Sequence, residues 1–536
     1  MSDTERRDEK GSGMARTNYL NFGSAIVGEQ RRRDPSGPAV TYRGGEAITN
    51  EQLDRAVDRR ARALQQAGVG RGEVVATLLQ STLAITEVYF AQSKVGSVLA
   101  ALNPYWPEAT LVGVLSRIRP TTFLYDAAFD DVVESIRPHS TGIERWIRVG
   151  GAAEGAIDLD ALASVASDAP FDAVAGGDDP LALFFTSGTT GLPKAVEYSH
   201  ASALTVAQKL WLDVPAGQDC AIGTGPIIWG VGFIAVAAPA LAAGARLVLE
   251  DDFAPDQFLV TVPREKITHI SVTPSFFSQL LGNDAHVGVD LTSLRVALLG
   301  GEPLLPSLQR RIVERFPRLQ LYGYYGQTEA PYSVIGRRDD GLLPEGAVGF
   351  ARTGGSVRVV DSRGTRVTDE PGEVQLSGPH VTSGYYNQPD KTAEALDDGW
   401  FDTGDLGTID RLGRLTVLGR RTDAIERAGQ FVLPARIEDA ASSVSGVHEA
   451  AAVGVKEPGG DDRILLVVQA DSNDSEIRTR IREALAADLP DWAQPDAIFT
   501  AAELPHANDG SGGRGKLLRR EVLAQWGHLT ERLSTR

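Results

Sequence analysis

A loop rich in glycine and hydroxyl side chains is the sharpest chemical signal in the sequence. The run FFTSGTTGLPK, residues 184–194, passes from an apolar stretch into small polar residues and ends at a lysine. Glycines let backbone N–H groups approach phosphate oxygens, hydroxyls add donors, and the lysine adds positive charge. The pattern predicts a phosphate-binding loop made of Thr186, Ser187, Gly188, Thr189, Thr190, Gly191 and Lys194. Because Ala195 follows the lysine, the loop is not of the Walker type, which has Ser or Thr there.

Further blocks follow this loop in a fixed order along most of the chain. They are YYGQTE (324–329), GYYNQPDKT (384–392), GWFDTGDLGTID (399–410), GRRTDAI (419–425) and GKLLRR (515–520). One block could arise by chance, but all of them in order make coincidence very improbable. The set resembles the adenylate-forming superfamily of acyl-CoA synthetases, luciferases and peptide-synthetase adenylation domains. The resemblance implies an AMP-forming ligase that uses ATP and Mg²⁺ to convert an acid into an acyl-AMP.

Attack of a carboxylate on the α-phosphate of ATP requires positive charge on the phosphates and at the transition state. By resemblance, Glu329 holds Mg²⁺ and Thr328 contacts the α-phosphate. One carboxylate plus phosphate oxygens suits the hard Mg²⁺ ion. Lys516, in the GKLLRR block, is expected to be the catalytic lysine that a small C-terminal domain brings to the α-phosphate.

The nucleoside half of ATP is expected to lie against three other groups. The resemblance places Tyr325 against adenine and Asp405 on the ribose hydroxyls, where one carboxylate can accept two hydrogen bonds. Arg420 would assist at the ribose. The loop beneath adenine is expected to consist of Gly300, Gly301 and Glu302, which follow the strand-like run RVALL.

The segment TGPIIWGVGF, residues 224–233, resembles the stretch that closes the acyl pocket. Peptide-synthetase relatives have an Asp directly after the aromatic residue, but here Gly230 follows Trp229. An α-amino acid is therefore disfavoured, because a buried ammonium needs an anion. The bulky Tyr324 stands where the family has a small residue, which favours a flat aromatic or short acid over a long acyl chain. The expected pocket residues are Trp229, Phe233, Tyr324, Tyr332 and Ser333.

Several positions depart from the family pattern and leave the final acceptor open. Thr422 stands at the hinge position, which carries Asp or Lys in the family, and Arg436 stands where Glu is common. The run HANDGSGGR, residues 506–514, lengthens the loop before Lys516. The acceptor is expected to be the thiol of coenzyme A or of a carrier-protein phosphopantetheine.

Two alternatives remain open. One is an unusual relative, such as an ATP-dependent diazotase that activates nitrite towards an aryl amine. The other is a catalytically lapsed nucleotide-binding protein that serves as a sensor or scaffold. Joint retention of Lys194, Glu329, Asp405 and Lys516 argues against a lapsed protein, because a binding module needs no mobile lysine.

These residues need a scaffold, and the sequence predicts an α/β fold. Short β-branched runs alternate with longer helical segments, which indicates βαβ units and layered mixed sheets. After about Gly355, hairpin patterns joined by D-x-x-G turns indicate a β-rich lobe. The last hundred or so residues indicate a small, mobile α+β domain. We expect a flexible tail over 1–18, an N-terminal nucleotide- and acid-binding domain over 19–420, and a C-terminal domain over 421–536.

The composition of the chain disfavours several classes of binding partner and location. A net charge of −18 over 536 residues disfavours nucleic acids and anionic membrane surfaces. Cys220 is the sole cysteine, so no internal disulfide is expected, and a reducing cytoplasm fits. The polar first residues lack the apolar stretch of a secretory signal. Residues 221–245 carry no charge, but five glycines and two prolines favour a buried helix and its approach loop over a membrane span.

Overall fold

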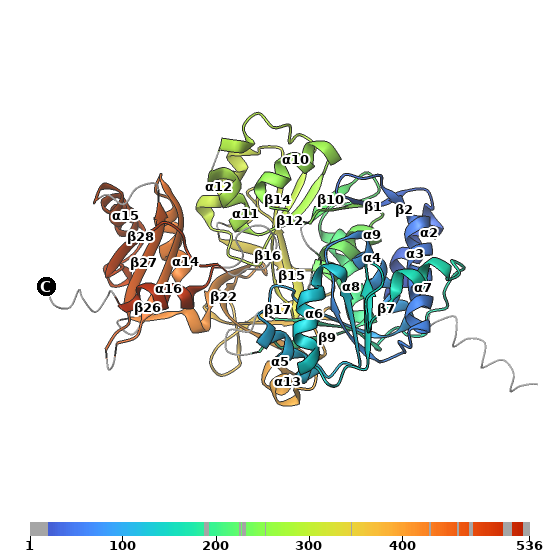
Figure 1. Cartoon of the computed structure of the whole chain (residues 1–536). Coiled ribbons are helices and arrows are strands. Elements are labelled where there is room, and N and C mark those ends of the chain that lie inside the picture. The colour runs from blue at the N-terminus through green and yellow to red at the C-terminus, as the bar shows by residue number, and fades with distance from the viewer. Residues whose placement is uncertain are drawn as a thin grey trace, which may run out of the picture.

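The computed structural model of the protein has a mixed α/β fold with a large N-terminal part and a smaller C-terminal part (Figure 1). It describes residues 20–186, 192–224, 227, 232–251, 253–282, 284–344, 346–427, 430–457, 460–470, 475–506 and 517–528. Of the expected site residues, Lys516, Trp229 and the loop residues 187–191 lie outside these ranges.

The first sheet of the N-terminal part is mostly parallel and buried on both faces. Its strands run in the order β20 (Gly384–Tyr385), β9 (Ala195–Ser199), β8 (Pro180–Phe185), β4 (Val98–Ala101), β3 (Val74–Leu78), β5 (Thr122–Asp126), β6 (Arg145–Val149) and β7 (Ile157–Asp158). All residues of β3 are buried, as the continuous apolar run VVATL predicts for a strand covered on both sides. Val75 packs into one core cluster, and its neighbours Val74 and Ala76 pack into another on the opposite face.

Helices cover both faces of this sheet. The Val75 side is covered by α3 (Asn50–Gln66), α4 (Leu83–Val95) and α8 (His200–Asp213), and the other side by α5 (Glu108–Ile118) and α6 (Asp130–Ile136). A capping box between Thr49 and Gln52 begins α3. Helix α8 packs into the same cluster as Leu298 and Ile335 of the second sheet, so it lies between the two sheets.

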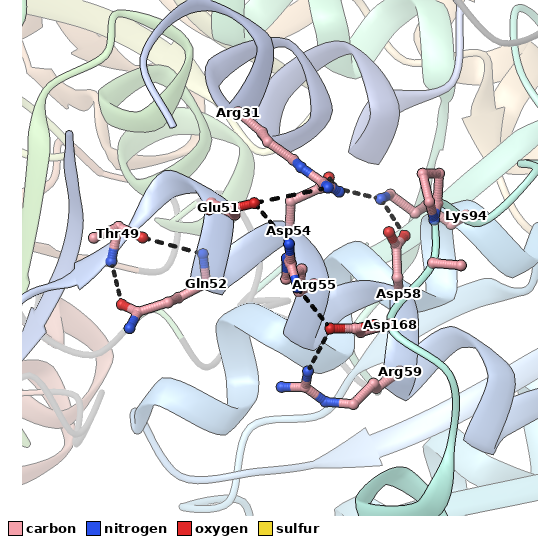
Figure 2. A network of polar contacts seen from close by, with 12 residues as sticks. Arg31, Thr49, Glu51, Gln52, Asp54, Arg55, Asp58, Arg59, Lys94 and Asp168 are labelled. Atoms are coloured by element: carbon pink, nitrogen blue, oxygen red, sulfur yellow. Dashed lines mark hydrogen bonds and ion pairs between the residues drawn. The ribbon is translucent and has the colours of Figure 1, made fainter. Parts of the chain in front are cut away.

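A buried cation joins α3 to α4 in the first layer (Figure 2). Nζ of Lys94 lies 2.7 Å from Oδ1 of Asp54 and 2.7 Å from Oδ1 of Asp58. Burial raises the pKa of Asp58, and the positive charge of Lys94 opposes that shift. Arg31 adds a second ion pair to Asp54, 3.1 Å long, from the preceding helix α2 (Glu29–Arg33). Lys94 and Asp54 thus each form two ion pairs within this network, which fixes the packing of the helices.

The second sheet is longer and carries most of the expected site residues. It runs in the order β18 (Arg366–Val367), β17 (Ser356–Val360), β19 (Gly372–Ser377), β22 (Trp400–Ile409), β23 (Leu415–Arg420), β16 (Ala347–Ala351), β15 (Ala330–Arg337), β14 (Gln320–Gln327), β13 (Val296–Leu299), β12 (His269–Val272), β10 (Ala221–Thr224), β11 (Arg246–Leu249), β1 (Pro38–Tyr42) and β2 (Ile48–Thr49), with β21 (Leu396–Asp397) beside β22. The predicted β-rich region after Gly355 is present and continues this sheet, because β16 pairs with β23.

Helices α10 (Pro255–Glu265), α11 (Pro274–Gly282) and α12 (Pro306–Arg315) cover the parallel half of the second sheet. The uncharged stretch 221–245 begins as strand β10 and continues, after residues outside the description, as the π-helix η4 (Phe233–Ala237) and α9 (Ala238–Ala242). The approach to the helix is therefore partly a strand, because Ile222 and its neighbours pair with β11 and β12. Across the ranges described, no helix has the length and apolarity needed to cross a membrane.

The C-terminal part is built on a separate small sheet with its own core (Figure 1). Strands β26 (Val447–Val455), β27 (Arg463–Ala470) and β28 (Ala497–Ala501) pack against α14 (Pro434–Ser442), α15 (Ser475–Asp488) and α16 (Arg519–Trp526). A small hairpin, β24 (Ile425–Arg427) and β25 (Gln430–Val432), precedes α14. Oδ1 of Asp439 accepts hydrogen bonds from N and Oγ of Ser307, at 3.1 and 2.6 Å, which joins α14 to α12.

Candidate active site

Lys194 lies at the end of the glycine-rich loop, directly before β9. Strands β8 and β9 are antiparallel, and the N–H of Thr186 donates to the carbonyl of Lys194 over 3.1 Å, so the strands close the base of the loop. Nζ of Lys194 lies 4.4 Å from the ring centroid of Tyr385. A cation at this distance from an aromatic face is attracted by the ring. The lysine head is therefore held beside β20, the strand formed by the GYYNQPDKT block.

Tyr385 links this lysine to the expected metal ligand. Strand β20 pairs with β9, with Tyr385 opposite Val196, and the Tyr385 hydroxyl donates to Oε1 of Glu329 over 2.8 Å. Burial and the negative charge of Glu329 raise the pKa of Tyr385, so the hydroxyl stays a donor. Glu329 is buried, and its bond to Tyr385 involves only one of its two carboxylate oxygens. Sequence reasoning quoted Tyr385 within its block and gave it no role.

The turn that carries Thr328 and Glu329 is fixed from its backbone. The hydroxyl of Tyr198, in β9, donates to the carbonyl of Thr328 over 2.6 Å, and the N–H of Thr382 donates to the carbonyl of Glu329 over 2.8 Å. A Cβ on Gly326 would lie 2.5 Å from the carbonyl oxygen of Ala330, so only glycine fits between β14 and β15. The YYGQTE block is thus a tight turn whose carboxylate meets Tyr385.

Asp405 collects several donors at the start of the β22–β23 hairpin. Its Oδ2 accepts from the hydroxyl of Tyr325 at 2.6 Å and from Nε2 of Gln327 at 2.9 Å. Nε of Arg420 lies 3.0 Å from Oδ1, because Asp405 and Arg420 are directly paired across the two strands. Asp405 is buried. Burial and the negative charge of Asp405 raise the pKa of Tyr325. The expected adenine and ribose residues therefore meet at one carboxylate.

The loop after β13 lies beside Tyr324. A Cβ on Gly300 would come within 2.5 Å of the Tyr324 ring, so the ring packs on this glycine. Gly301 has a φ of +80°, a conformation that favours glycine. Oε2 of Glu302 accepts from the N–H of Ser275 at the start of α11, over 3.1 Å, and burial raises the pKa of Glu302. The expected adenine loop thus joins β13 to α11.

An apolar cavity lies between α8, η4 and the second sheet. It is lined by Leu210, Ile222, Ala235, Val236, His269, Ile270, Ser271, Leu298 and Tyr332. The Tyr332 and Tyr324 rings meet with centroids 4.4 Å apart, and the Tyr332 hydroxyl lies 3.3 Å from Oγ of Ser271. Tyr332 thus lines this cavity, and its ring contacts that of Tyr324.

Two other expected pocket residues face elsewhere. Phe233 packs against Phe22, Tyr89 and Phe90, with centroids 5.0 to 5.8 Å apart, and its neighbours on η4 line the cavity instead. Ser333 is buried, and its hydroxyl lies 2.8 Å from the carbonyl of Ala330 and 2.9 Å from Nε2 of His380. Tyr332 has a φ of +48°, which breaks the regular side-chain alternation of β15 at this residue, and its neighbour Ser333 does not line the cavity.

Residues near Lys516 in the chain contact the C-terminal sheet and helix α14. Leu517 forms a bridge with His506, whose Nε2 lies 2.7 Å from Oε1 of Glu449. Arg519 donates through Nη2 to both carboxylate oxygens of Glu438, at 2.8 Å each. The block is thus tied to β26 and α14. Thr422 lies in the short 3₁₀ turn η6 (Arg421–Asp423), and Arg436 is exposed on α14.

A metal ion could be held by Glu329 through its second oxygen. Within the ranges described, no three His, Cys, Asp or Glu side chains gather into a protein-only metal cluster. A single carboxylate beside a lysine fits an ion that is bound mainly by phosphate oxygens, as Mg²⁺ is at nucleotide sites. The donor set therefore suits Mg²⁺ that arrives with ATP.

The chain matches known proteins along most of its length. The AMP-binding enzyme family matches residues 27–386, and the AMP-binding enzyme C-terminal domain matches residues 436–511. A feruloyl-CoA synthase from Amycolatopsis sp. is 30% identical over 92% of this chain and 97% of its own length. A medium-chain fatty-acid–CoA ligase from Escherichia coli is 28% identical over 92% of this chain and 89% of its own.

Among solved structures, the ATP-bound MatB from Rhodopseudomonas palustris superposes with a TM-score of 0.85 and 25% identity, over 95% of this chain and 99% of that one. The family match covers both parts of the chain, and the fold agrees throughout. The chain therefore belongs to the AMP-binding enzyme family, within the adenylate-forming superfamily.

Proposed function

We propose that this acid–thiol ligase adenylates a short or aromatic carboxylic acid and transfers the acyl group to coenzyme A. The observation that carries the proposal is the contact chain from Lys194 over the Tyr385 ring to Glu329, with Thr328 in the same turn. A cation, a metal-binding carboxylate and a hydroxyl residue thereby meet where the glycine-rich loop ends. This set can neutralise and orient a triphosphate.

In the first step, an oxygen of the acid attacks the α-phosphorus of ATP and the bond to the bridging oxygen of the β-phosphate breaks, so pyrophosphate leaves. Lys194 would bind the phosphates, and Glu329 would hold Mg²⁺, which supplies charge neutralisation when bound. Asp405, oriented by Tyr325 and Arg420, would accept hydrogen bonds from the ribose hydroxyls. Lys516 would stabilise the charge that develops on the α-phosphate.

In the second step, the thiolate of coenzyme A attacks the acyl carbonyl and AMP leaves with the bonding electrons. Coenzyme A is favoured as acceptor because the named relatives are CoA-forming enzymes. An aromatic or short acid is favoured because Tyr324 and Tyr332 lie face to edge beside the apolar cavity. The feruloyl-CoA synthase acts on an aromatic acid, as its name states, which supports the same class.

Pyrophosphate release over a panel of acids tests this proposal. Short, aromatic and fatty acids are each incubated with ATP and Mg²⁺, with and without coenzyme A, and products are identified by mass. We expect an acyl-AMP without coenzyme A and an acyl-CoA with it. Nitrite with an aryl amine and a carrier protein form separate arms, and turnover confined to either arm would replace the proposed substrates. Release from no acid and neither arm would favour a lapsed protein.

A further inference from the structure

Backbone contacts join the two ends of the segment that contains Lys516. His506 and Leu517 form an antiparallel bridge, and the N–H of Leu518 donates to the carbonyl of Pro505 over 2.9 Å. We call these four paired residues the segment base. Lys516 directly precedes Leu517 in the chain, so the segment base is the described structure nearest to it. Closing a longer connection costs more conformational entropy, which gives contacts at the segment base more to offset.

The side chain of His506 fixes the segment base to strand β26. Its Nδ1 lies 2.8 Å from the carbonyl oxygen of Leu504, and its Nε2 lies 2.7 Å from Oε1 of Glu449. A carbonyl oxygen and a carboxylate oxygen both accept, so the ring satisfies both contacts when each nitrogen carries a proton. The side chain of His506 is only 8% exposed. A charge-assisted pair of this kind is shorter and stronger than a neutral hydrogen bond.

A second ion pair lies on the other side of Lys516. Arg519 donates through Nη2 to both carboxylate oxygens of Glu438, and Oε1 of Glu438 also accepts from the N–H of Ala452 in β26 over 3.0 Å. Burial acts to lower the pKa of Arg519, but nearby carboxylates, which include Glu438 and Glu302, raise it. The chain is thus tied to the C-terminal sheet and α14 both before and after Lys516.

This part of the C-terminal sheet faces the loop that is expected beneath adenine. The hydroxyl of Ser278, in α11, donates to the carbonyl of His448 over 3.2 Å, and His448 directly precedes Glu449 in β26. Glu302, which binds the start of α11, belongs to the expected adenine loop. Burial raises the pKa of Glu302, the charge of Glu449 raises it further, and the charge of His506 lowers it. The groups that hold the segment base therefore lie close to the nucleotide side of the site.

We propose that His506 is a positioning residue for the adenylation step, because its pair with Glu449 holds the segment that carries Lys516 to β26. The inference rests on the proposed function, in which Lys516 stabilises the charge that develops on the α-phosphate. His506 contacts neither the nucleotide nor the acid in this role. Misplacement of a reacting group by about 1 Å can cost about 10²-fold in rate, so a loose segment base slows adenylation. Transfer from acyl-AMP to coenzyme A does not need Lys516 and is spared.

The two half-reactions separate positioning from general destabilisation. Pyrophosphate release is measured in single turnover at saturating ATP with benzoate and butanoate, or with the acid of the panel above that is turned over fastest. Transfer to coenzyme A is measured separately from the synthetic acyl-AMP of the same acid. For His506→Ala we expect release to slow about 10- to 100-fold, the range for misplacing a catalytic group, while transfer and the KM for ATP stay unchanged.

A double-mutant cycle assigns the effect to the pair. Glu449→Ala should slow release as much as His506→Ala, and the double variant should lose no more than either alone, because the two side chains form one contact. His506→Gln keeps an amide donor for Glu449 and should recover part of the rate. Glu457→Ala is the matched control, because it breaks an ion pair of the same sheet, to Arg463 over 2.6 Å, and should change neither step. If His506→Ala does not fold, Glu449→Ala and His506→Gln decide by the ratio of release to transfer.

Amide hydrogen exchange tests the segment base without any acid. The N–H of Leu518 is bonded to the carbonyl of Pro505, so its exchange reports opening of the segment base. Exchange at Leu518 should quicken in His506→Ala and in Glu449→Ala and stay as slow in Glu457→Ala as in the unmodified protein.

The outcomes separate the two proposals. Unchanged release in His506→Ala, or unchanged exchange at Leu518, would overturn the role of His506 and leave the adenylation proposal standing. Equal losses of release and transfer would also overturn it, because they would show only a destabilised fold. If the unmodified protein turns over no acid, the proposed function fails, and the role of His506 in adenylation fails with it.

Discussion

The nucleotide side and the acid side of the candidate site differ in whether their buried charged groups have hydrogen-bond partners. On the nucleotide side, Asp405 is bound by Tyr325, Gln327 and Arg420, and Glu329 is bound by Tyr385. On the acid side, the guanidinium of Arg352 makes no hydrogen bond to a described residue, and the negative charge of Asp213 opposes the lowering of its pKa by burial. The carboxylates expected to bind the nucleotide thus already have donors, whereas the guanidinium of Arg352 makes no hydrogen bond to a described residue. The following predictions would break or sharpen this contrast.

The largest effect is expected from the catalytic lysine. Lys516→Ala should lower the rate of pyrophosphate release about 10²- to 10³-fold, the usual cost of removing one group that stabilises transition-state charge. Release is measured in single turnover with saturating ATP and acid. Arg520→Gln, an exposed basic residue of the same block, is the control and should change little. Equal losses in both variants would show that general basic charge, rather than Lys516, is needed.

The ribose carboxylate comes next. Asp405→Asn removes the charge that pairs with Arg420, so we expect the KM for ATP to rise about 10- to 100-fold, as for loss of hydrogen bonds to a charged group. The KM for the acid should stay the same, which confines the effect to the nucleotide side. Asp410→Asn at the turn of the same hairpin is the control. An unchanged KM for ATP in Asp405→Asn would contradict the assignment.

Removal of one hydroxyl should have a smaller effect. Tyr385→Phe keeps the ring under Lys194 and removes the hydrogen bond to Glu329, so about a tenfold loss of kcat/KM for ATP is expected. The Mg²⁺ concentration for half-maximal activity should shift, because the carboxylate loses its orienting donor. Tyr386→Phe, the adjacent tyrosine, is the control. If Tyr385→Phe changes neither the activity nor the Mg²⁺ dependence, Tyr385 does not position Glu329.

The last prediction concerns stability, with no expected change in activity at pH 7, and it involves the first residue of helix α8. His200 begins α8, is buried, and accepts a hydrogen bond at Nδ1 from the N–H of Phe22 over 3.0 Å. Burial lowers the pKa of His200 from 6.5 to about 4. The unfolded chain therefore binds a proton that the folded protein does not, so this stability is present above pH 6.5 and is lost as the pH falls towards 4.

The free energy of unfolding should fall by about 3 kcal/mol at pH 4 because of His200. Urea unfolding between pH 7 and pH 4 measures it. His200→Gln keeps an acceptor for the N–H of Phe22 and cannot titrate. The free energy of unfolding of this variant should therefore depend less on pH, while the KM for ATP at pH 7 stays unchanged. If the free energy of unfolding depends on pH equally in both proteins, His200 is not the titrating group.

The sequence predicted the fold class and the family well, because both depend on local patterns. Apolar runs such as VVATL gave buried strands, and the ordered blocks gave the family that the comparisons confirm. Contacts between segments far apart in the sequence could not be predicted in the same way. The bond from Tyr385 to Glu329 depends on the pairing of β20 with β9, which no spacing along the chain reveals.

The acid side was harder to predict for the same reason. Phe233 and Ser333 were expected to line the pocket, but Phe233 packs against other aromatic rings and the hydroxyl of Ser333 lies within hydrogen-bonding distance of His380. Arg352 carried no motif at all, and only the structure shows that it is buried without a hydrogen bond to a described residue. These contacts depend on tertiary packing, which local sequence patterns do not reveal.

A crystal structure with a non-hydrolysable ATP analogue and Mg²⁺ tests the nucleotide assignment most directly. It should show the phosphates within hydrogen-bonding distance of Lys194, Mg²⁺ on Glu329 and the ribose hydroxyls on Asp405, with the three side chains close to their present places. A nucleotide bound elsewhere, or one that leaves both carboxylates without contact, would contradict the account.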